Sequence, residues 1–271
     1  MNAGFSKYIS RILLLCILPG FLLAGCSSAK PVTESVSFAM IGNTSPDSPF
    51  TGFSKTLSST LDEIESRKPQ IIVHTGDALY GGSDADGILE SDIRRQLNLF
   101  FSIINKLNTA AYTIPGERDY FNNSAELYLE FSRKKLSYSF NYGSIHFICL
   151  SSSETGESFI DDEQFKWLKK DLRNFRDSNA IFIFAHHQLF PDNRKTKTTE
   201  MNEKLHELFL KYNVKAVFSG SERDYSEKLK DSIRYINAGY TAGTDKKNLK
   251  KSSRYYLVNF YKNEIRVEPV K

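Results

Sequence analysis

The chain has 271 residues, of which 40% are hydrophobic, and its formal net charge at pH 7 is +4. This length and composition allow one sizeable hydrophobic core rather than two small ones. The charge is too small to indicate a nucleic acid as the partner.

The first 25 residues differ in character from the rest of the chain. Lys7 and Arg11 precede an apolar stretch, Ile12–Leu23, that is short for a membrane span. Small residues then lead to Cys26, as in a secretory signal. The letters LLAGC that end at Cys26 resemble a bacterial lipobox, in which the cysteine is lipidated and becomes the new N-terminus. We therefore expect residues 1–25 to be a lipoprotein signal peptide, with an uncleaved N-terminal anchor as the alternative.

Cleavage before Cys26 has consequences for charge, thiols and location. Two basic residues and no acidic residue leave with the signal, so the net charge falls from +4 to +2. Ser27 follows the cysteine where an Asp would mark inner-membrane retention, so we expect a lipid-anchored protein of the bacterial cell envelope, at the outer membrane if the organism has one. We expect residues 26–35 to be a lipidated tether. Cys149 is the only other thiol left; it lies in an apolar strand pattern and has no intramolecular disulfide partner.

Beyond the tether, apolar strand patterns alternate with helical patterns. Most of the strand patterns are apolar throughout, which suits strands buried on both faces. The predicted strands are Val36–Ile41, Gln70–Thr75, Ala111–Ile114, Ala180–Ala185, Val214–Ser219 and Ile233–Ala238. The predicted helices are Phe53–Arg67, Ser91–Leu107, Ala125–Lys134, Glu163–Arg176 and Glu200–Tyr212. Asp161 and Gln164 form a candidate capping box for the fourth helix.

Two hairpins interrupt this alternation. Leu136–Leu150 contains two strand patterns around an Asn-Tyr-Gly-Ser turn, and Arg254–Val270 contains two more around Lys262 and Asn263. Alternating strands and helices together with antiparallel hairpins predict an α/β sandwich that forms a single domain over residues 36–271.

Polar residues follow several of the predicted strands. In open α/β folds, functional groups gather in the loops past the carboxyl ends of the strands. Five such loops in series indicate one common site, formed by Asn43, Asp77, Glu117, Arg118, His186, His187 and Arg223. The tetrapeptide Glu-Arg-Asp-Tyr occurs in two of these loops, at 117–120 and at 222–225. The surroundings of the two copies are dissimilar, so they are not an internal repeat.

The order and spacing of these loops resemble the calcineurin-like metallophosphoesterases, including their purple acid phosphatase branch. Thr75–Asp77 matches the Gly-Asp motif in full, and Tyr80 resembles the tyrosine that follows this motif in purple acid phosphatases. His186 occupies the position of the fourth motif's metal ligand. The resemblance covers roughly Val36 to Gly243 and implies a four-layer α/β/β/α sandwich.

Other positions depart from the family pattern. The resemblance implies two metal ions that clamp a phosphoryl group and activate a water. The departures are Asn43 for Asp, Ser45 for His, Glu117 for Asn, Arg118 for the catalytic-acid His, and Ser221 and Arg223 for two His. The first ion would face Arg223, and a guanidinium has no lone pair to offer a metal. We therefore expect the binuclear centre to be lost.

Two arrangements of the remaining site stay open. Two carboxylates and one imidazole could hold a single Mn, Fe or Zn ion: Asp77, Glu117 and His186, with Ser221 as a weak fourth ligand. Alternatively, no metal binds, and Arg118 and Arg223 take the place of the metals by pairing with the carboxylates.

The expected function follows from these alternatives. The first is a degenerate phosphoesterase-fold lipoprotein that binds phosphate or another anion, or serves as an envelope scaffold, with the membrane as its partner through Cys26. The second is an active phosphoesterase with one metal ion. The candidate catalytic residues are Arg118, Arg223 and His187, and the further cleft residues are Asn43, Ser45, Tyr80 and Ser221.

Overall fold

The computed structural model describes residues 35–152, 160–190, 199–241 and 255–271. The expected signal peptide, the lipidation site at Cys26 and the tether up to residue 34 therefore lie outside the described residues. Among the described residues, none of the helices combines the length and apolar character needed to cross a membrane.

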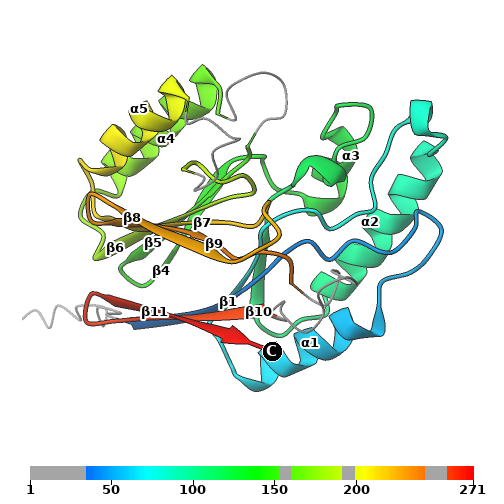
Figure 1. The fold of residues 1–271 in the computed structure, drawn as a ribbon, viewed down its shortest axis with the longest axis horizontal. Helices are drawn as coiled ribbons and strands as arrows, with labels where there is room; N and C mark the ends of the chain where they lie inside the picture. Colours follow the sequence, from blue (N-terminus) through cyan, green and yellow to red (C-terminus); the bar gives the residue numbers. More distant parts are fainter. Residues whose placement is uncertain (1–34, 153–159, 191–198, 242–254) are drawn as a thin grey trace, which may run out of the picture. The chain divides into compact units, whose positions relative to one another are not determined.

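The described strands form two sheets (Figure 1). The first sheet has the order β11-β10-β1-β2-β3, in which β1, β2 and β3 run parallel and β10 runs antiparallel to both of its neighbours. Its strands are β1 (Ser35–Ile41), β2 (Ile71–His74), β3 (Ala110–Thr113), β10 (Tyr255–Tyr261) and β11 (Glu264–Val270).

The second sheet has the order β4-β5-β6-β7-β9-β8. Its four central strands run parallel, and an antiparallel strand flanks them at each edge. Its strands are β4 (Tyr138–Tyr142), β5 (Ile145–Leu150), β6 (Ala180–Ala185), β7 (Val214–Ser219), β8 (Ser226–Lys230) and β9 (Ile233–Asn237).

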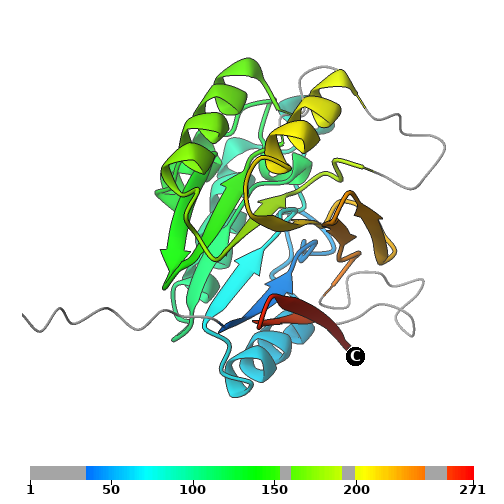
Figure 2. The ribbon, with the colours of Figure 1, turned by 90° about the vertical axis from the view of Figure 1, so that its left-hand side faces the viewer.

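Helices cover the outer face of each sheet. The α-helices are α1 (Lys55–Ser66), α2 (Glu90–Ile104), α3 (Glu126–Ser132), α4 (Asp162–Asn174) and α5 (Glu200–Phe209). Buried side chains of α4 and α5 pack on the second sheet, and those of α1 pack on the first. A third core joins α2 and α3 to the loop that follows β2. Figures 1 and 2 show α4 and α5 on one side of the paired sheets and α1 on the other. This arrangement is the expected α/β/β/α sandwich, in one domain.

The predicted elements are all present. Each of the six predicted strands agrees with an observed strand to within one residue at either end, and both hairpins are confirmed. The helices end up to three residues earlier than predicted. One half of the capping box is confirmed, because the Asp161 side chain accepts a hydrogen bond from the Gln164 N–H at 2.8 Å. The Gln164 side chain instead accepts a hydrogen bond from the hydroxyl of Ser137 at 3.0 Å.

The sequence patterns missed the strand β8. Its residues, Ser-Glu-Lys-Leu-Lys, are mostly polar and exposed, and it pairs only with β9 at the edge of the sheet. An edge strand that buries neither face has no apolar run to indicate it, which explains the omission.

The core between the two sheets is rich in aromatic rings. Phe38 on β1 is fully buried, and its ring centre lies 5.5 to 5.7 Å from four rings of the second sheet. These rings belong to Phe147, Phe182, Phe184 and Phe218. Such edge-to-face and tilted contacts add to the free energy gained by burying the rings. Phe38 therefore joins the sheet that begins the domain to the sheet that follows it.

We predict that Phe38→Ala lowers the free energy of unfolding by about 3 to 5 kcal/mol, because it leaves a cavity among four rings. Denaturant unfolding followed by circular dichroism measures this change. Phe50→Ala is the matched control: that ring is 70% exposed, so its loss is expected to change the free energy of unfolding by no more than about 0.5 kcal/mol. Equal effects at the two positions would contradict the assigned core.

Candidate functional site

The carboxyl ends of β1, β2, β3, β6 and β7 meet at one edge of the sandwich, and backbone hydrogen bonds tie their loops together. The N–H groups of Asn43 and Thr44 donate to the carbonyls of Gly76 and Asp77 at 2.9 and 3.0 Å. On the other sheet, two N–H groups of the loop after β7 donate to the carbonyl of His186 at 3.0 Å. The expectation that these strand ends form one site is consistent with this geometry.

Asp77 sits in a strained turn. Its φ is 56°, and it follows Gly76 with a φ of 98°. A non-glycine residue in the left-handed region is uncommon, although Asp tolerates it better than most. The turn directs the buried carboxylate of Asp77 toward the loop after β3, where its Oδ1 accepts the backbone N–H of Arg118 at 3.0 Å.

Asp119 joins the two loops after β2 and β3. One of its oxygens accepts the N–H groups of Ala78 and Leu79 at 2.9 and 3.0 Å, and the other accepts the N–H of Gly116 at 2.9 Å. Asp119 is buried, and burial together with the nearby Asp77 raises its pKa to about 7. Three backbone donors on one carboxylate fix the two loops relative to each other.

Gly116 is required by the close approach of these loops. A Cβ atom at this position would overlap the Asp77 side chain, the Asp77 backbone and the His186 ring. Only glycine lets the turn after β3 lie against both side chains, which is why Glu117 can reach the histidines.

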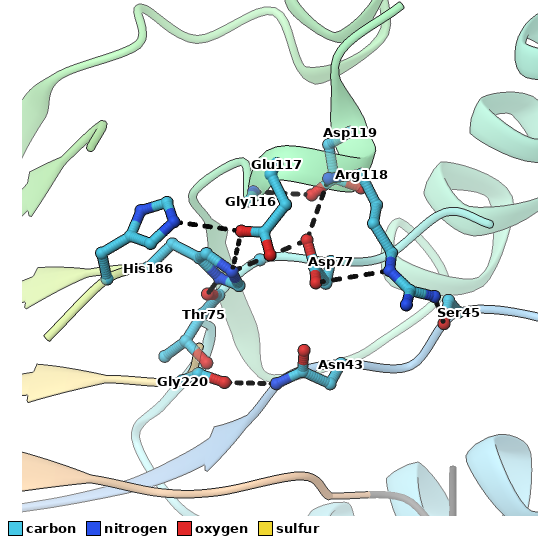
Figure 3. Close-up of polar contacts among 12 residues, drawn as sticks. Asn43, Ser45, Thr75, Asp77, Gly116, Glu117, Arg118, Asp119, His186 and Gly220 are labelled. Carbon is cyan, nitrogen blue, oxygen red and sulfur yellow. Dashed lines mark hydrogen bonds and ion pairs between the residues drawn. The ribbon is translucent and has the colours of Figure 1, made fainter. Parts of the chain in front are cut away.

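Three side chains converge at the centre of the site (Figure 3). The Nε2 atom of His186 lies 2.9 Å from Oε2 of Glu117 and 3.6 Å from Oδ1 of Asp77. Nε2 of His187 lies 3.1 Å from the same Glu117 oxygen. His186 is fully buried, whereas the Glu117 side chain is 47% exposed. The candidate ligands Asp77, Glu117 and His186 are thus brought together, and His187 joins them.

The orientation of His186 is set by its other nitrogen. Nδ1 lies 2.7 Å from the carbonyl oxygen of Thr75, and a carbonyl can only accept, so Nδ1 carries a hydrogen. Nε2 is buried without a hydrogen-bond partner among the described residues, because its contact with Glu117 lacks hydrogen-bond geometry. In the neutral ring, the lone pair on Nε2 therefore faces two carboxylates.

The two carboxylates and the ring shift one another's ionisation. Burial by itself lowers the pKa of His186, but Glu117 and Asp77 more than offset it and raise the pKa to about 9. Burial raises the pKa of Glu117, but the two adjacent imidazoles outweigh it and lower the pKa below its usual value. For Asp77, burial and the Glu117 charge raise the pKa, although His186 and Arg118 oppose this. The centre therefore stabilises a positive charge, carried by a proton or by a metal ion.

Arg118 occupies the other side of Asp77. Its Nε lies 3.8 Å from Oδ2 of Asp77, and its Nη1 lies 3.5 Å from Oγ of Ser45. The guanidinium thus stands between two positions that the resemblance assigns to ligands of the first metal (Figure 3). The contact between Arg118 and Asp77 is longer than a hydrogen-bonded ion pair, and the Arg118 side chain is 48% exposed.

The remaining predicted site residues lie around this centre. The Asn43 amide donates to the carbonyl of Gly220, and the N–H of Ser221 donates to that of His186. Tyr80 is partly exposed. The Arg223 guanidinium lies 5.7 Å from the ring centre of Tyr240. The described side-chain ion pairs of Asp77 and Glu117 are with Arg118, His186 and His187.

Two contributors were not recognised as such from the sequence. Asp119 was noted from the sequence only as part of the tetrapeptide Glu-Arg-Asp-Tyr. Ser152 was not considered, although its Oγ lies 2.7 Å from Nδ1 of His187. Ser152 follows β5 by two residues, so the rule that loops after strand carboxyl ends carry function could have found it.

This two-sheet architecture is that of the metallophosphoesterase sandwich. The sequence model of the calcineurin-like phosphoesterase family matches residues 51–220, so the chain belongs to that family. No curated protein sequence gives a match.

Solved structures with the same fold are distant in sequence. A dimetal phosphatase from Danio rerio is 12% identical, with a TM-score of 0.66 over 86% of this chain and 95% of that one. GAP50 of Plasmodium, described as the anchor in the inner membrane complex, is 14% identical, with a TM-score of 0.60 over 88% of this chain and 84% of that one. The purple acid phosphatase PPD1 of yellow lupin is 14% identical, with a TM-score of 0.61 over 87% of this chain and 51% of that one.

The family is metal-dependent, and part of the site fits a metal ion. Glu117, His186 and His187 each offer one ligand atom, and these atoms lie within 4.8 Å of one another. The Nε2 atom of His186, which makes no hydrogen bond among the described residues, is the kind of atom that a metal ion satisfies. The half of the cleft that contains Arg118 does not fit, because a guanidinium is no ligand and repels a cation.

We predict that Asp119→Ala lowers the free energy of unfolding by more than about 2 kcal/mol, because it leaves three backbone donors buried without an acceptor. Denaturant unfolding measures the change. Asp62→Ala on the exposed face of α1 removes a carboxylate of the same kind and is expected to change the free energy of unfolding by no more than about 0.5 kcal/mol. A loss at Asp119 no larger than that at Asp62 would rule out its role in fixing the loops.

Proposed function

We propose that this protein is a lipid-anchored envelope member of its family whose cleft lacks a binuclear metal centre and binds a phosphate-type anion. The observation that carries the proposal is the position of Arg118, beside Ser45 and Asp77. A divalent ion about 5 Å from a guanidinium would be repelled by about 7 kcal/mol at an effective dielectric constant near 20. The same guanidinium attracts an anion and can donate two parallel hydrogen bonds to phosphate oxygens.

The exposure of the cleft supports anion binding. About half of the Arg118 side chain is open to solvent, so a ligand can reach it without displacing the core. Asp77 is buried behind Arg118, and its charge is partly balanced by His186 and by the N–H of Arg118. An anion would therefore meet the guanidinium before it meets a carboxylate.

An envelope scaffold is the other form of this proposal. GAP50, described as an anchor in a membrane complex, has the same fold. At 14% identity this likeness concerns the fold alone. It supports the scaffold role only by showing that a protein with this fold is described as an anchor.

A second candidate is a phosphoesterase with one Mn, Fe or Zn ion held by Asp77, Glu117 and His186. It is favoured by the buried Nε2 atom of His186, which makes no hydrogen bond among the described residues. In that case the ion would supply Lewis-acid chemistry, and Arg118 and Arg223 would neutralise the phosphoryl oxygens. An arginine stays protonated at neutral pH, so Arg118 would not replace the family's proton-donating histidine. A substrate with a good leaving group would be required.

We predict that inorganic phosphate raises the melting temperature of the full-length chain, purified in detergent and freed of metal with a chelator. Saturation at 100 times Kd corresponds to about 2.7 kcal/mol of stabilisation. Arg118→Ala is expected to weaken binding at least tenfold, as measured by calorimetry. Arg176→Ala, which removes an exposed arginine of α4's C-terminal loop, is the control and leaves binding unchanged.

Two outcomes would count against anion binding. One is that phosphate leaves the melting temperature of wild type unchanged. The other is that phosphate raises the melting temperature of Arg118→Ala as much as that of wild type. Metal-dependent hydrolysis of p-nitrophenyl phosphate that is lost in Asp77→Ala would instead favour the second candidate.

We also predict that Cys26 carries lipid. In a bacterial host supplied with labelled palmitate, wild type is expected to incorporate label and to fractionate with membranes, whereas Cys26→Ser does neither. Cys149→Ala removes a buried thiol and is expected to keep both properties. Label in Cys26→Ser would contradict the anchor.

A further inference from the structure

We propose that Glu117, His186 and His187 form a single transition-metal site, in which Ser152 and the carbonyl of Thr75 orient the two imidazoles. The proposal rests on the single-metal candidate above and changes its ligand set, because it adds His187 as a ligand. It also assigns Ser152 a role in positioning that ligand.

The two histidines approach the same atom. Their Nε2 atoms lie 2.9 and 3.1 Å from Oε2 of Glu117. Donor atoms that bind one tetrahedral ion at about 2.0 to 2.1 Å are about 3.3 Å apart. Both distances to Glu117 are thus close to this value, and all three ligand atoms lie within 4.8 Å of one another.

The ring orientations favour a shared ion. The two imidazole planes are 88° apart, with ring centres separated by 4.9 Å, so the rings reach Glu117 from different directions. His186 comes from the end of β6, and His187 is the next residue along the chain. The Nε2 atoms of these adjacent residues both face one carboxylate, so the two rings can bind the same ion as ligands rather than stack on each other.

Each imidazole is held by its other nitrogen. Nδ1 of His186 donates to the carbonyl of Thr75 at 2.7 Å. Nδ1 of His187 lies 2.7 Å from the hydroxyl oxygen of Ser152, which also accepts the His187 backbone N–H at 3.3 Å. Histidines that bind metals are oriented by such bonds, which leave Nε2 free to bind the ion.

A proton alone explains the site less well than an ion does. If Glu117 merely accepted N–H groups from both rings, each Nε2 would point its hydrogen at the carboxylate. The contact of His186 with Glu117 lacks this geometry, and its Nε2 is fully buried. A metal ion beside the carboxylate oxygen would satisfy this nitrogen.

The donor set indicates the kind of metal. Two imidazoles and one carboxylate suit Zn, Fe or Mn better than Mg or Ca, which prefer oxygen ligands. Asp77, 3.6 Å from Nε2 of His186, is within reach as a further oxygen donor. Glu117 is half exposed, so an ion can enter from solvent and keep an open position.

The test is titration of the full-length, chelator-treated chain with Co²⁺, whose visible absorption reports nitrogen ligation, followed by competition with Zn²⁺. We expect one ion per chain. His187→Ala is expected to weaken binding at least tenfold, and Ser152→Ala by about 10- to 100-fold. Ser151→Ala is the matched control, because its hydroxyl contacts Tyr120 rather than a histidine, and it should stay within about threefold of wild type.

Circular dichroism and the melting temperature without metal show whether each variant folds. If His187→Ala does not fold, Ser152→Ala decides the question, because its loss of affinity is expected without loss of the ligand itself. Failure of wild type to bind Co²⁺ or Zn²⁺, or unchanged affinity in both His187→Ala and Ser152→Ala, would overturn the proposal.

These outcomes are separate from those of the proposed function. Phosphate binding is measured on the metal-free chain and depends on Arg118, so it can succeed while the metal site fails. Two ions per chain would contradict the proposed absence of a binuclear centre, and the His187 and Ser152 variants would still decide which ligands hold the first ion.

Discussion

The contact of a buried imidazole with two carboxylates governs the chemistry of this cleft. His186 is tied to Thr75 through Nδ1, so its Nε2 must face Glu117 and Asp77. Burying carboxylates is costly without a positive charge nearby. The loops that place these groups are themselves held by Asp119, which accepts three backbone N–H groups. These bonds limit how far the carboxylates of Asp77 and Glu117 can move apart to reduce their mutual repulsion. The centre of the site therefore favours a proton or a metal ion.

Two sources of positive charge divide the cleft. One half contains the two histidines and Glu117, where a proton or an ion can be accommodated and exchanged. The other half contains the guanidinium of Arg118, which is permanent and cannot leave. Asp77 contacts both halves. In our proposal, one exchangeable charge and one fixed charge stand where the family pattern has a pair of ions, and this asymmetry would distinguish the chain from that pattern.

The sequence predicted the fold in more detail than the site. Apolar runs such as Ala180–Ala185 are buried on both faces, so their pattern locates a strand to the residue, whereas the polar edge strand β8 gave no such signal. The strand-end rule found Asp77, Glu117 and His186 because motifs fix their backbone positions. It could not give side-chain direction: Arg118 lies toward Ser45, and Arg223 lies by Tyr240. Ser152 was missed because its role depends on the direction of the His187 ring, which the sequence does not give.

The bond between the loops at residue 118 does not restrict the side chain at that position. Asp77 accepts the backbone N–H of this residue, which every amino acid except proline provides. The turn therefore does not depend on which side chain position 118 carries. A histidine and an arginine can replace one another there while the Asp77 contact persists, so the side chain at position 118 can change without altering the turn that holds Asp77.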